Sequence, residues 1–217
     1  SVQSAYTGSI DNVSVKEVGQ DWTLGTGWSI GEDKAVSIAS GGGVGVSQSV
    51  SGQVFSGKTY KVEYTILDYV SGNVRPSFSG GGSISGVTND GNGTYVQYLT
   101  LIANNTSFNI KASGTDGGFN GSITNISVKE VGQNWLFSGG AEITGQGARI
   151  NNTITGANAF VKQVNSNLTI GKSLVFQYDV VQTNGKDLAI EQIGGNISLN
   201  TSTIGNNRKV YFEFDRA

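Results

Sequence analysis

Apolar and polar residues alternate along most of the chain, which is the pattern of half-buried β-strands. Residues 60–66 place Tyr60, Val62, Tyr64 and Ile66 on one face and polar side chains on the other. No window of about 11–18 residues shows helical periodicity. The sequence therefore predicts an all-β chain, with further strands at residues 35–40, 44–50, 106–113, 118–131, 148–155 and 159–164.

A long internal repeat divides the sequence. Residues 9–22 recur as residues 122–135, with eleven of fourteen positions identical and an offset of 113. Residues 60–64 return more loosely as 174–178. This period is that of a whole domain, since a solenoid coil repeats every ~20–50 residues. We therefore expect tandem modules: residues 1–18 as the closing strand of a preceding module, 19–131 as a complete module, and 132–217 as a second module that is C-terminally incomplete.

The boundaries of the modules do not coincide with the first and last residues of the sequence, and this mismatch has two interpretations. In the first, the sequence is a fragment of a longer chain of modules. In the second, residues 1–18 complete the unfinished second module of a neighbouring copy by strand donation. Donation would supply only one of the two strands missing from that module, which counts against the second interpretation.

About seven or eight short strands in ~110 residues, separated by turns rich in Gly and Asn, predict an antiparallel β-sandwich of the jelly-roll type. A trimeric β-helix fibre competes, but the domain-length repeat disfavours it. We align Val96 and Tyr98 with Val210 and Phe212 and place all four inside. The other inward positions are Val74, Pro76, Leu174, Phe176, Tyr178, Val180, Leu188, Ile190 and Phe214, and the outward positions include Lys61, Glu63, Arg75, Ser77, Tyr95, Gln97, Lys209, Tyr211 and Glu213.

The amino-acid composition excludes several kinds of catalytic, metal and binding site. The 217 residues include 33 glycines and no Cys, His or Met, and the net charge is −2. Without His or Cys the chain cannot form a Ser-His-Asp triad or an ordinary zinc, haem or iron–sulfur site. A slightly acidic balance without basic runs argues against nucleic acid as a partner. No segment approaches the ~20 apolar residues of a membrane-spanning helix.

The motifs of the repeat resemble a known family. Residues 119–131 are similar to the (F/Y)-x-G-S-I-D-N-V-S-V-K-E-V ending of carbohydrate-binding-module-like jelly-roll repeats, which are common in tailed-phage virion proteins. Residues 22–30 resemble the W-x-x-G-x-G-W start of such repeats, and residues 57–62 their central G-K-T-Y-K-V strand. The resemblance is looser in the second module, where Ala141 stands in place of Trp28.

This resemblance implies a role as well as a fold. We expect a non-enzymatic, extracellular virion protein (a tail-fibre, tail-associated or capsid-decorating component) that serves assembly and attachment to a host glycan. The expected partners are other virion subunits, further copies of this chain, and the surface glycan. The alternative is an extracellular adhesin or filament subunit of a bacterium or other environmental organism, built from the same modules.

A saccharide site needs an exposed aromatic ring for stacking and polar groups beside it. Trp28 has no aromatic counterpart in the second module and is the best single candidate for that ring, although core packing is the favoured interpretation of this residue. The alternative for the polar candidates is a solvated face without a ligand. The polar and aromatic candidates are Lys61, Glu63, Arg75, Tyr95 and Gln97 in the first module, and Gln177, Asp179, Glu191 and Tyr211 in the second.

The acidic residues do not form a pattern typical of a hydrolase. Catalysis would rest on carboxylates such as Glu32, Asp33 and Asp68, but most acids fall in turns or at outward positions and do not recur, as where Glu63 becomes Gln177. We therefore expect no enzyme activity and no cofactor. Asp-containing turns such as residues 89–92 suit a structural calcium ion, but turn chemistry explains them as well and no ligand set follows.

Overall fold

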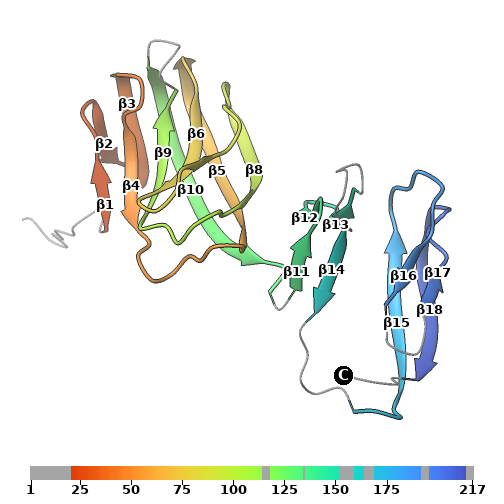
Figure 1. The fold of residues 1–217 in the computed structure, drawn as a ribbon. Helices are drawn as coiled ribbons and strands as arrows, with labels where there is room; N and C mark the ends of the chain where they lie inside the picture. Colours follow the sequence, from red (N-terminus) through yellow and green to blue (C-terminus); the bar gives the residue numbers. More distant parts are fainter. Residues whose placement is uncertain are drawn as a thin grey trace, which may run out of the picture. The chain divides into compact units, whose positions relative to one another are not determined.

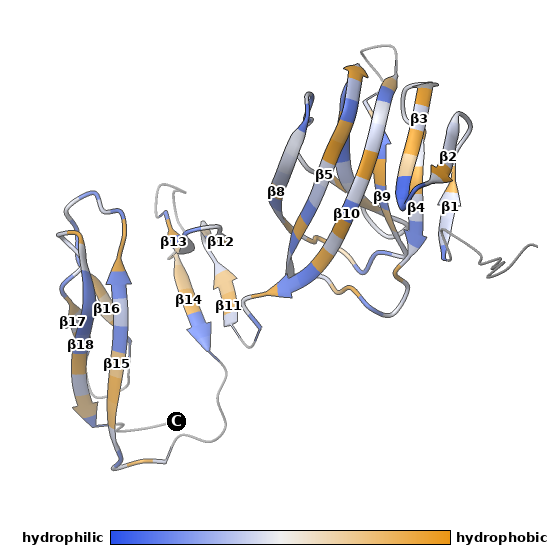
Figure 2. Ribbon diagram, turned by 180° about the vertical axis from the view of Figure 1, so that it is seen from behind, coloured by the Kyte–Doolittle hydropathy of each residue, from blue (hydrophilic) through white to orange (hydrophobic). Residues whose placement is uncertain are grey.

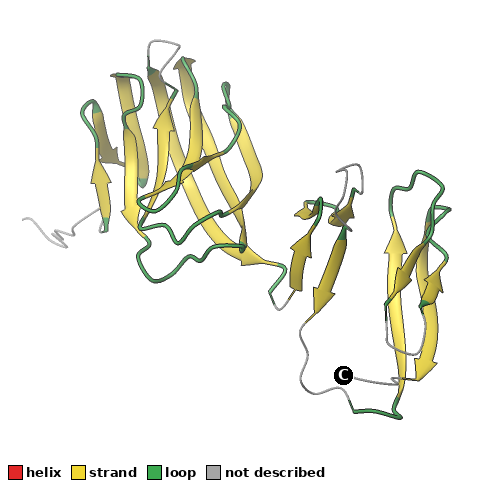
Figure 3. Cartoon of the chain, viewed as in Figure 1, coloured by secondary structure: helices red, strands yellow, loops and turns green. Residues whose placement is uncertain are grey.

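The computed structural model is all-β, and no helix occurs among the residues that it describes (Figure 3). These residues are 21–113, 118–133, 135–151, 159–163, 169–191 and 196–213. The chain divides into two compact units, Ser1–Val131 and Gly132–Ala217. The predicted closing strand at residues 1–18 lies outside the described residues.

Unit 1 is a sandwich of two antiparallel sheets (Figure 1). The first sheet has the order β1-β4-β9-β6-β7, and the second has the order β2-β3-β10-β5-β8. From β3 onward, each strand lies in the sheet opposite to its predecessor, except that β7 follows β6 in the same sheet. The strands are β1 (Trp22–Leu24), β2 (Trp28–Gly31), β3 (Lys34–Ser40), β4 (Gly45–Ser49), β5 (Thr59–Ser71), β6 (Val74–Ser79), β7 (Ile84–Ser85), β8 (Gly93–Thr100), β9 (Ser107–Ala112) and β10 (Phe119–Val131).

The core of unit 1 lies between these sheets. Apolar and polar residues alternate along β5 (Figure 2), and its predicted inward residues, Tyr60, Val62, Tyr64 and Ile66, are all buried. The opposite sheet contributes buried aromatic and aliphatic side chains from β4, β6 and β9. Aromatic contacts cross the core, as between Tyr60 and Phe78, whose ring centroids are 5.7 Å apart. The period-two pattern therefore predicted the buried face of β5 correctly.

The described part of unit 2 contains four two-stranded antiparallel sheets, β11-β14, β12-β13, β15-β18 and β16-β17. On β15 the predicted inward residues are less exposed than their neighbours, which confirms the faces of that strand. Leu188 on β16 was also expected inside, but it is 40% exposed, so that prediction is wrong. Only Val180 and Leu199 are buried apolar residues in the described part of this unit. The strands are β11 (Trp135–Ser138), β12 (Ala141–Thr144), β13 (Gly147–Ile150), β14 (Phe160–Gln163), β15 (Ser173–Val180), β16 (Leu188–Ile190), β17 (Ile197–Leu199) and β18 (Gly205–Glu213).

The predicted faces of β8 are wrong. Val96 points outward and is 46% exposed, whereas Tyr95 packs against the core. The cause is the alignment of the two copies. Val62 pairs with Gln97 on β8, and Phe176, the counterpart of Val62, pairs with Val210 on β18. Val210 therefore corresponds to Gln97 rather than to Val96, and a shift of one residue reverses every side chain of a strand.

Ser77 is a second correction. It was expected to point outward into solvent, but it is 0% exposed. On β6 it pairs with Asn109 of β9 on one side and with Ser85 of β7 on the other. Its short side chain is covered because it lies between these two neighbouring strands.

Candidate binding face

The outer face of the sheet β2-β3-β10-β5-β8 carries the polar side chains of β5. Lys61 and Glu63 point outward there, and their Nζ and Oε2 atoms form an ion pair of 2.8 Å. The hydrogen bond between them raises the pKa of Lys61 and lowers the pKa of Glu63. Both groups are therefore charged at neutral pH. Across the strand pair, Lys61 lies opposite Tyr98.

Tyr95 and Gln97 do not belong to this face. The Tyr95 ring packs 5.8 Å from the Tyr64 ring, and its hydroxyl donates to the Gly91 carbonyl at 3.0 Å. The Gln97 side chain accepts a hydrogen bond from the Val87 backbone N–H at 2.7 Å and donates to the Val87 carbonyl at 2.9 Å. Both side chains hold the segment before β8 against the strand, so their predicted outward positions are wrong.

Arg75 also lies apart from Lys61 and Glu63, and Tyr211 belongs to the other unit. Arg75 is on β6, which belongs to the other sheet of the sandwich. The outer faces of two packed sheets point in opposite directions. Tyr211 lies on β18 of unit 2 and is 74% exposed. The hypothesis of one shared face for the unit 1 candidates is wrong, and only Lys61 and Glu63 remain together.

Trp28 is a core residue. It is 7% exposed, and its ring stacks on Phe119 with the centroids 5.8 Å apart and the planes at 15°. Its partner across the strand pair is Ser37, which is also buried. The prediction of an exposed stacking ring is therefore wrong, and the alternative of core packing is confirmed.

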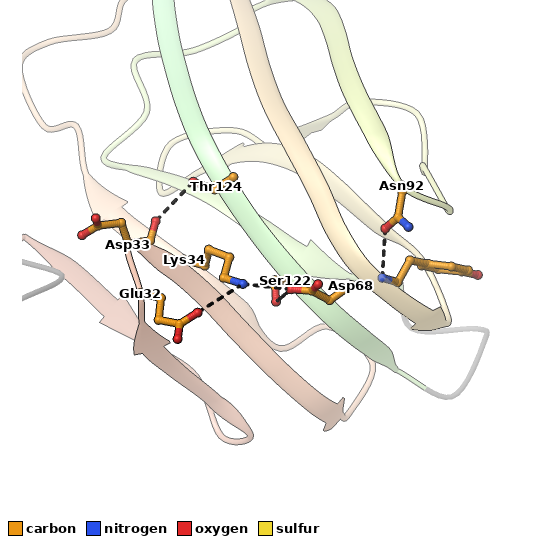
Figure 4. A network of polar contacts seen from close by, with 8 residues as sticks. Glu32, Asp33, Lys34, Asp68, Asn92, Ser122 and Thr124 are labelled. Carbon is orange, nitrogen blue, oxygen red and sulfur yellow. Dashed lines mark hydrogen bonds and ion pairs between the residues drawn. The ribbon is translucent and has the colours of Figure 1, made fainter.

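A hollow on the outer face was missed by the sequence analysis. It has a volume of about 450 Å³ and combines polar groups with the apolar side chains of Val36 and Ile38. Figure 4 shows Lys34 between Glu32 and Asp68, with Ser122 beside Asp68. The polar residues that line the hollow are Glu32, Lys34, Ser37, Asp68, Asn120 and Ser122.

Two irregularities of the backbone build this hollow. Glu32 and Asp33 both have positive φ, 52° and 60°, in the tight turn that joins β2 to β3 and places Lys34 at the start of β3. Asp68 has φ of 51° where the pairing of β5 with β10 shifts register between Asn120 and Ser122. Such a bulge re-aims the side chain. Simple alternation does not reveal it.

The polar groups of the hollow are bound to one another. Lys34 Nζ lies 3.0 Å from Asp68 Oδ2 and 3.8 Å from a Glu32 carboxylate oxygen. The Ser122 hydroxyl donates to the same Asp68 oxygen at 3.0 Å. The hydrogen bonds from Lys34 and Ser122 hold the pKa of Asp68 below its usual value, and Asp68 raises the pKa of Lys34. At neutral pH the hollow therefore offers an ammonium group beside carboxylates.

The turn considered for calcium uses its oxygens within the protein. Asn89 Oδ1 accepts a hydrogen bond from the Tyr64 hydroxyl at 2.8 Å. Asn92 Oδ1 accepts one from the Tyr69 backbone N–H at 3.0 Å. Across the described ranges, no three acidic side chains gather as a metal site would require. Hydrogen bonding within the fold accounts for these Asn side chains.

The described part of the chain holds no helix long and apolar enough to cross a bilayer. Comparison of the sequence with protein-family models and with curated proteins found no match.

Proposed function

We propose that this chain is a structural protein of a tailed-phage virion, in a tail-fibre, tail-associated or capsid-decorating component. Its jelly-roll modules serve assembly and attachment to saccharides of the host surface. The observation that carries the proposal is the path of the strands from β3 to β10. They lie in the orders β3-β10-β5-β8 and β4-β9-β6-β7, which suits a jelly roll. This agrees with the fold implied by the motif resemblance of residues 119–131.

The hollow on the outer face supports saccharide binding. Sugar hydroxyls form hydrogen bonds with charged side chains, and the C–H groups of a sugar ring pack on apolar ones. Lys34 and Asp68 provide the first kind of contact. Ile38, which is 76% exposed, provides the second. A surface hollow that offers both kinds of contact suits a saccharide ligand.

The charges of the same hollow favour binding over hydrolysis. A glycosidase needs a carboxylic acid with a raised pKa to protonate the leaving group. Here the hydrogen bond from Lys34 lowers the pKa of Asp68, and Glu32 lies beside the same ammonium group. The Asp68 carboxyl group is thus held in the ionised form, which is the wrong form for a general acid.

A glycan microarray probed with the whole chain tests attachment. We expect binding to bacterial surface saccharides, reduced at least ten-fold by Asp68→Asn, because the Lys34 contact is weakened. Glu142→Gln is the matched control, since Glu142 is an exposed carboxylate paired with Arg149 in unit 2. Absence of any bound saccharide, or equal loss in both variants, would refute the binding role of the hollow.

Immunogold electron microscopy with an antibody to this chain tests the virion assignment. Gold particles on phage tails or capsids are the expected result. Labelling of cell-surface filaments, with none on phage particles, would favour the adhesin alternative and reject the virion assignment.

A further inference from the structure

The outer face of the sheet β1-β4-β9-β6-β7 consists mainly of short polar side chains. On β6 and β9 the residues Phe78, Phe108 and Ile110 are buried in the core, so the residues that alternate with them point outward. One row of directly paired residues crosses all five strands and contains Thr23, Ser47, Asn109, Ser77 and Ser85. A second row contains Ser49, Ser107 and Ser79. We call these two rows, together with Arg75 and Lys111 beside them, the serine face.

Two cationic side chains lie next to each other on the serine face. Arg75 on β6 and Lys111 on β9 are directly paired across neighbouring strands, on the same outer side as Ser77 and Asn109. The Cα atoms of such a pair are about 4.5–5.5 Å apart. Like charges placed opposite each other destabilise a sheet. This pair therefore reduces the stability of the sheet unless an anion lies close to both side chains.

The sheet itself provides no acidic side chain to compensate this charge. Its strands β1, β4, β6, β7 and β9 contain no Asp or Glu. Among the described residues, ion pairs involve Lys34, Lys58, Lys61 and Arg149, but neither Arg75 nor Lys111. Arg75 and Lys111 therefore form a positive patch that is available to an anionic ligand.

Unsatisfied hydrogen-bond donors at the same place provide a second, independent observation. Arg75 Nε and Ser77 Oγ are both buried, and neither has a hydrogen-bond partner in the described part of the chain. The two residues point to the same side of β6, and Ser77 is 0% exposed. Buried polar groups in proteins are nearly always hydrogen-bonded. Both atoms carry a proton that an oxygen acceptor would bind.

We propose that the serine face binds an acidic saccharide, with Arg75 and Lys111 holding its carboxylate or phosphate group. A guanidinium group binds either oxyanion through two parallel hydrogen bonds, and the lysine ammonium group adds a second positive charge. Side-chain rotation is common when a ligand binds, and it lets the Arg75 Nε–H turn toward the anion. The hydroxyl and amide groups of the two rows, such as those of Ser47 and Asn109, hydrogen-bond to the hydroxyls of the same saccharide.

The composition of the serine face favours a saccharide over a protein or a nucleic acid. The centre of a protein interface is enriched in apolar and aromatic side chains, and the two rows contain neither. Single-stranded nucleic acid is bound by aromatic rings on which the bases stack, and the rows have no such ring. Hydroxyl and amide groups instead match a ligand that is itself rich in hydroxyls.

The serine face is separate from the hollow described above. It belongs to the other sheet of the sandwich, whose outer face points in the opposite direction. In the hollow, Lys34 lies beside the carboxylates of Glu32 and Asp68, which repel an anion. The inference rests on the proposed function only for the choice of a saccharide, and it adds a second site with an acidic ligand.

Isothermal titration calorimetry of the full chain with two pairs of polymers tests this inference. The first pair is oligogalacturonate and its fully methyl-esterified form, which differ only in the charge of the carboxyl groups. The second pair is phosphate-substituted dextran and plain dextran. We expect the acidic member of at least one pair to bind about ten-fold or more tightly than its neutral counterpart, and added salt to weaken this binding. The responding pair identifies the anion as a carboxylate or a phosphate.

Charge-removing variants locate the binding. Arg75→Gln and Lys111→Gln should each weaken binding of the acidic polymer by about ten-fold or more, with unchanged circular dichroism spectra. Lys129→Gln is the matched control, because it removes the same charge from an exposed position of β10 in the other sheet. Asp68→Asn should also leave this binding unchanged, which distinguishes the serine face from the hollow.

Several results would overturn the proposal. These are equal affinity for the acidic and neutral members of both pairs, no binding of either acidic polymer, and a loss in Lys129→Gln or Asp68→Asn as large as in Arg75→Gln and Lys111→Gln. Sedimentation of the full chain provides a further check. Self-association that Arg75→Gln abolishes would assign the serine face to an acidic surface of a second copy and reject the saccharide ligand.

Discussion

At the scale of single residues, Trp28 shows how burial decides a role. Its stacking on Phe119 within the core predicts that Trp28→Ala destabilises unit 1 by about 3–5 kcal/mol, the usual cost of removing a large buried aromatic side chain. Urea unfolding followed by circular dichroism measures this. Tyr211→Ala is the control, because the Tyr211 ring is exposed and its loss should change stability by no more than about 0.5 kcal/mol. A loss below about 1 kcal/mol for Trp28→Ala would contradict the core assignment.

Asp68 gives a prediction about pH. Because hydrogen bonds lower its pKa in the folded chain, its contacts stabilise the fold above the ordinary Asp value of 3.8. This stabilisation is lost as the pH falls through the lowered pKa. Carbon-13 NMR of the Asp68 carboxyl group should give a midpoint below 3.8, and Ser122→Ala should move the midpoint upward. A wild-type midpoint at or above 3.8 would show that the contacts with Lys34 and Ser122 do not persist in solution.

At the scale of elements, β8 tests the corrected face assignment. Gln97→Ala removes a side chain that bonds both backbone groups of Val87, and we expect a loss of about 1–3 kcal/mol in stability. Val96→Thr changes an outward position and should cost no more than about 0.5 kcal/mol. Denaturant unfolding of both variants measures the difference. A larger loss for Val96→Thr than for Gln97→Ala would restore the faces first predicted from the sequence.

The sequence predicted the buried face correctly for some strands and wrongly for others. From Tyr60 to Ile66 on β5 the apolar residues occupy one face only, and on β15 Val175 is the single apolar residue on the outward face, so alternation predicted the inward sides of both strands. On β8, Tyr95, Val96, Tyr98 and Leu99 place apolar residues on both faces. Alternation could not choose between these faces, and a shifted alignment chose wrongly. The hollow was missed for a different reason, since the bulge that aims Asp68 outward is a tertiary feature of the β5–β10 pairing.

At the scale of the whole molecule, the repeat predicted from sequence and the pairing of strands carry different information. The sequence showed that residues 9–22 and 122–135 are copies, but not which strands pair. The strand orders of unit 1 show that β9 and β10 each hold two strand pairs together. The described part of unit 2 contains four strand pairs that correspond to the pairs β1-β4, β2-β3, β5-β8 and β6-β7 of unit 1.

Amide hydrogen exchange, measured residue by residue by NMR on the full chain, tests the jelly-roll strand order of unit 1 most directly. Tyr60–Glu63 on β5 pairs on both sides, with β10 and with β8. Strand β8 lies at the edge of the same sheet and pairs with β5 alone. All amides of Tyr60–Glu63 should therefore exchange slowly, whereas alternate amides of β8 should exchange rapidly. Rapid exchange of alternate amides within Tyr60–Glu63 would contradict the position of β5 between β10 and β8, and with it the jelly-roll order.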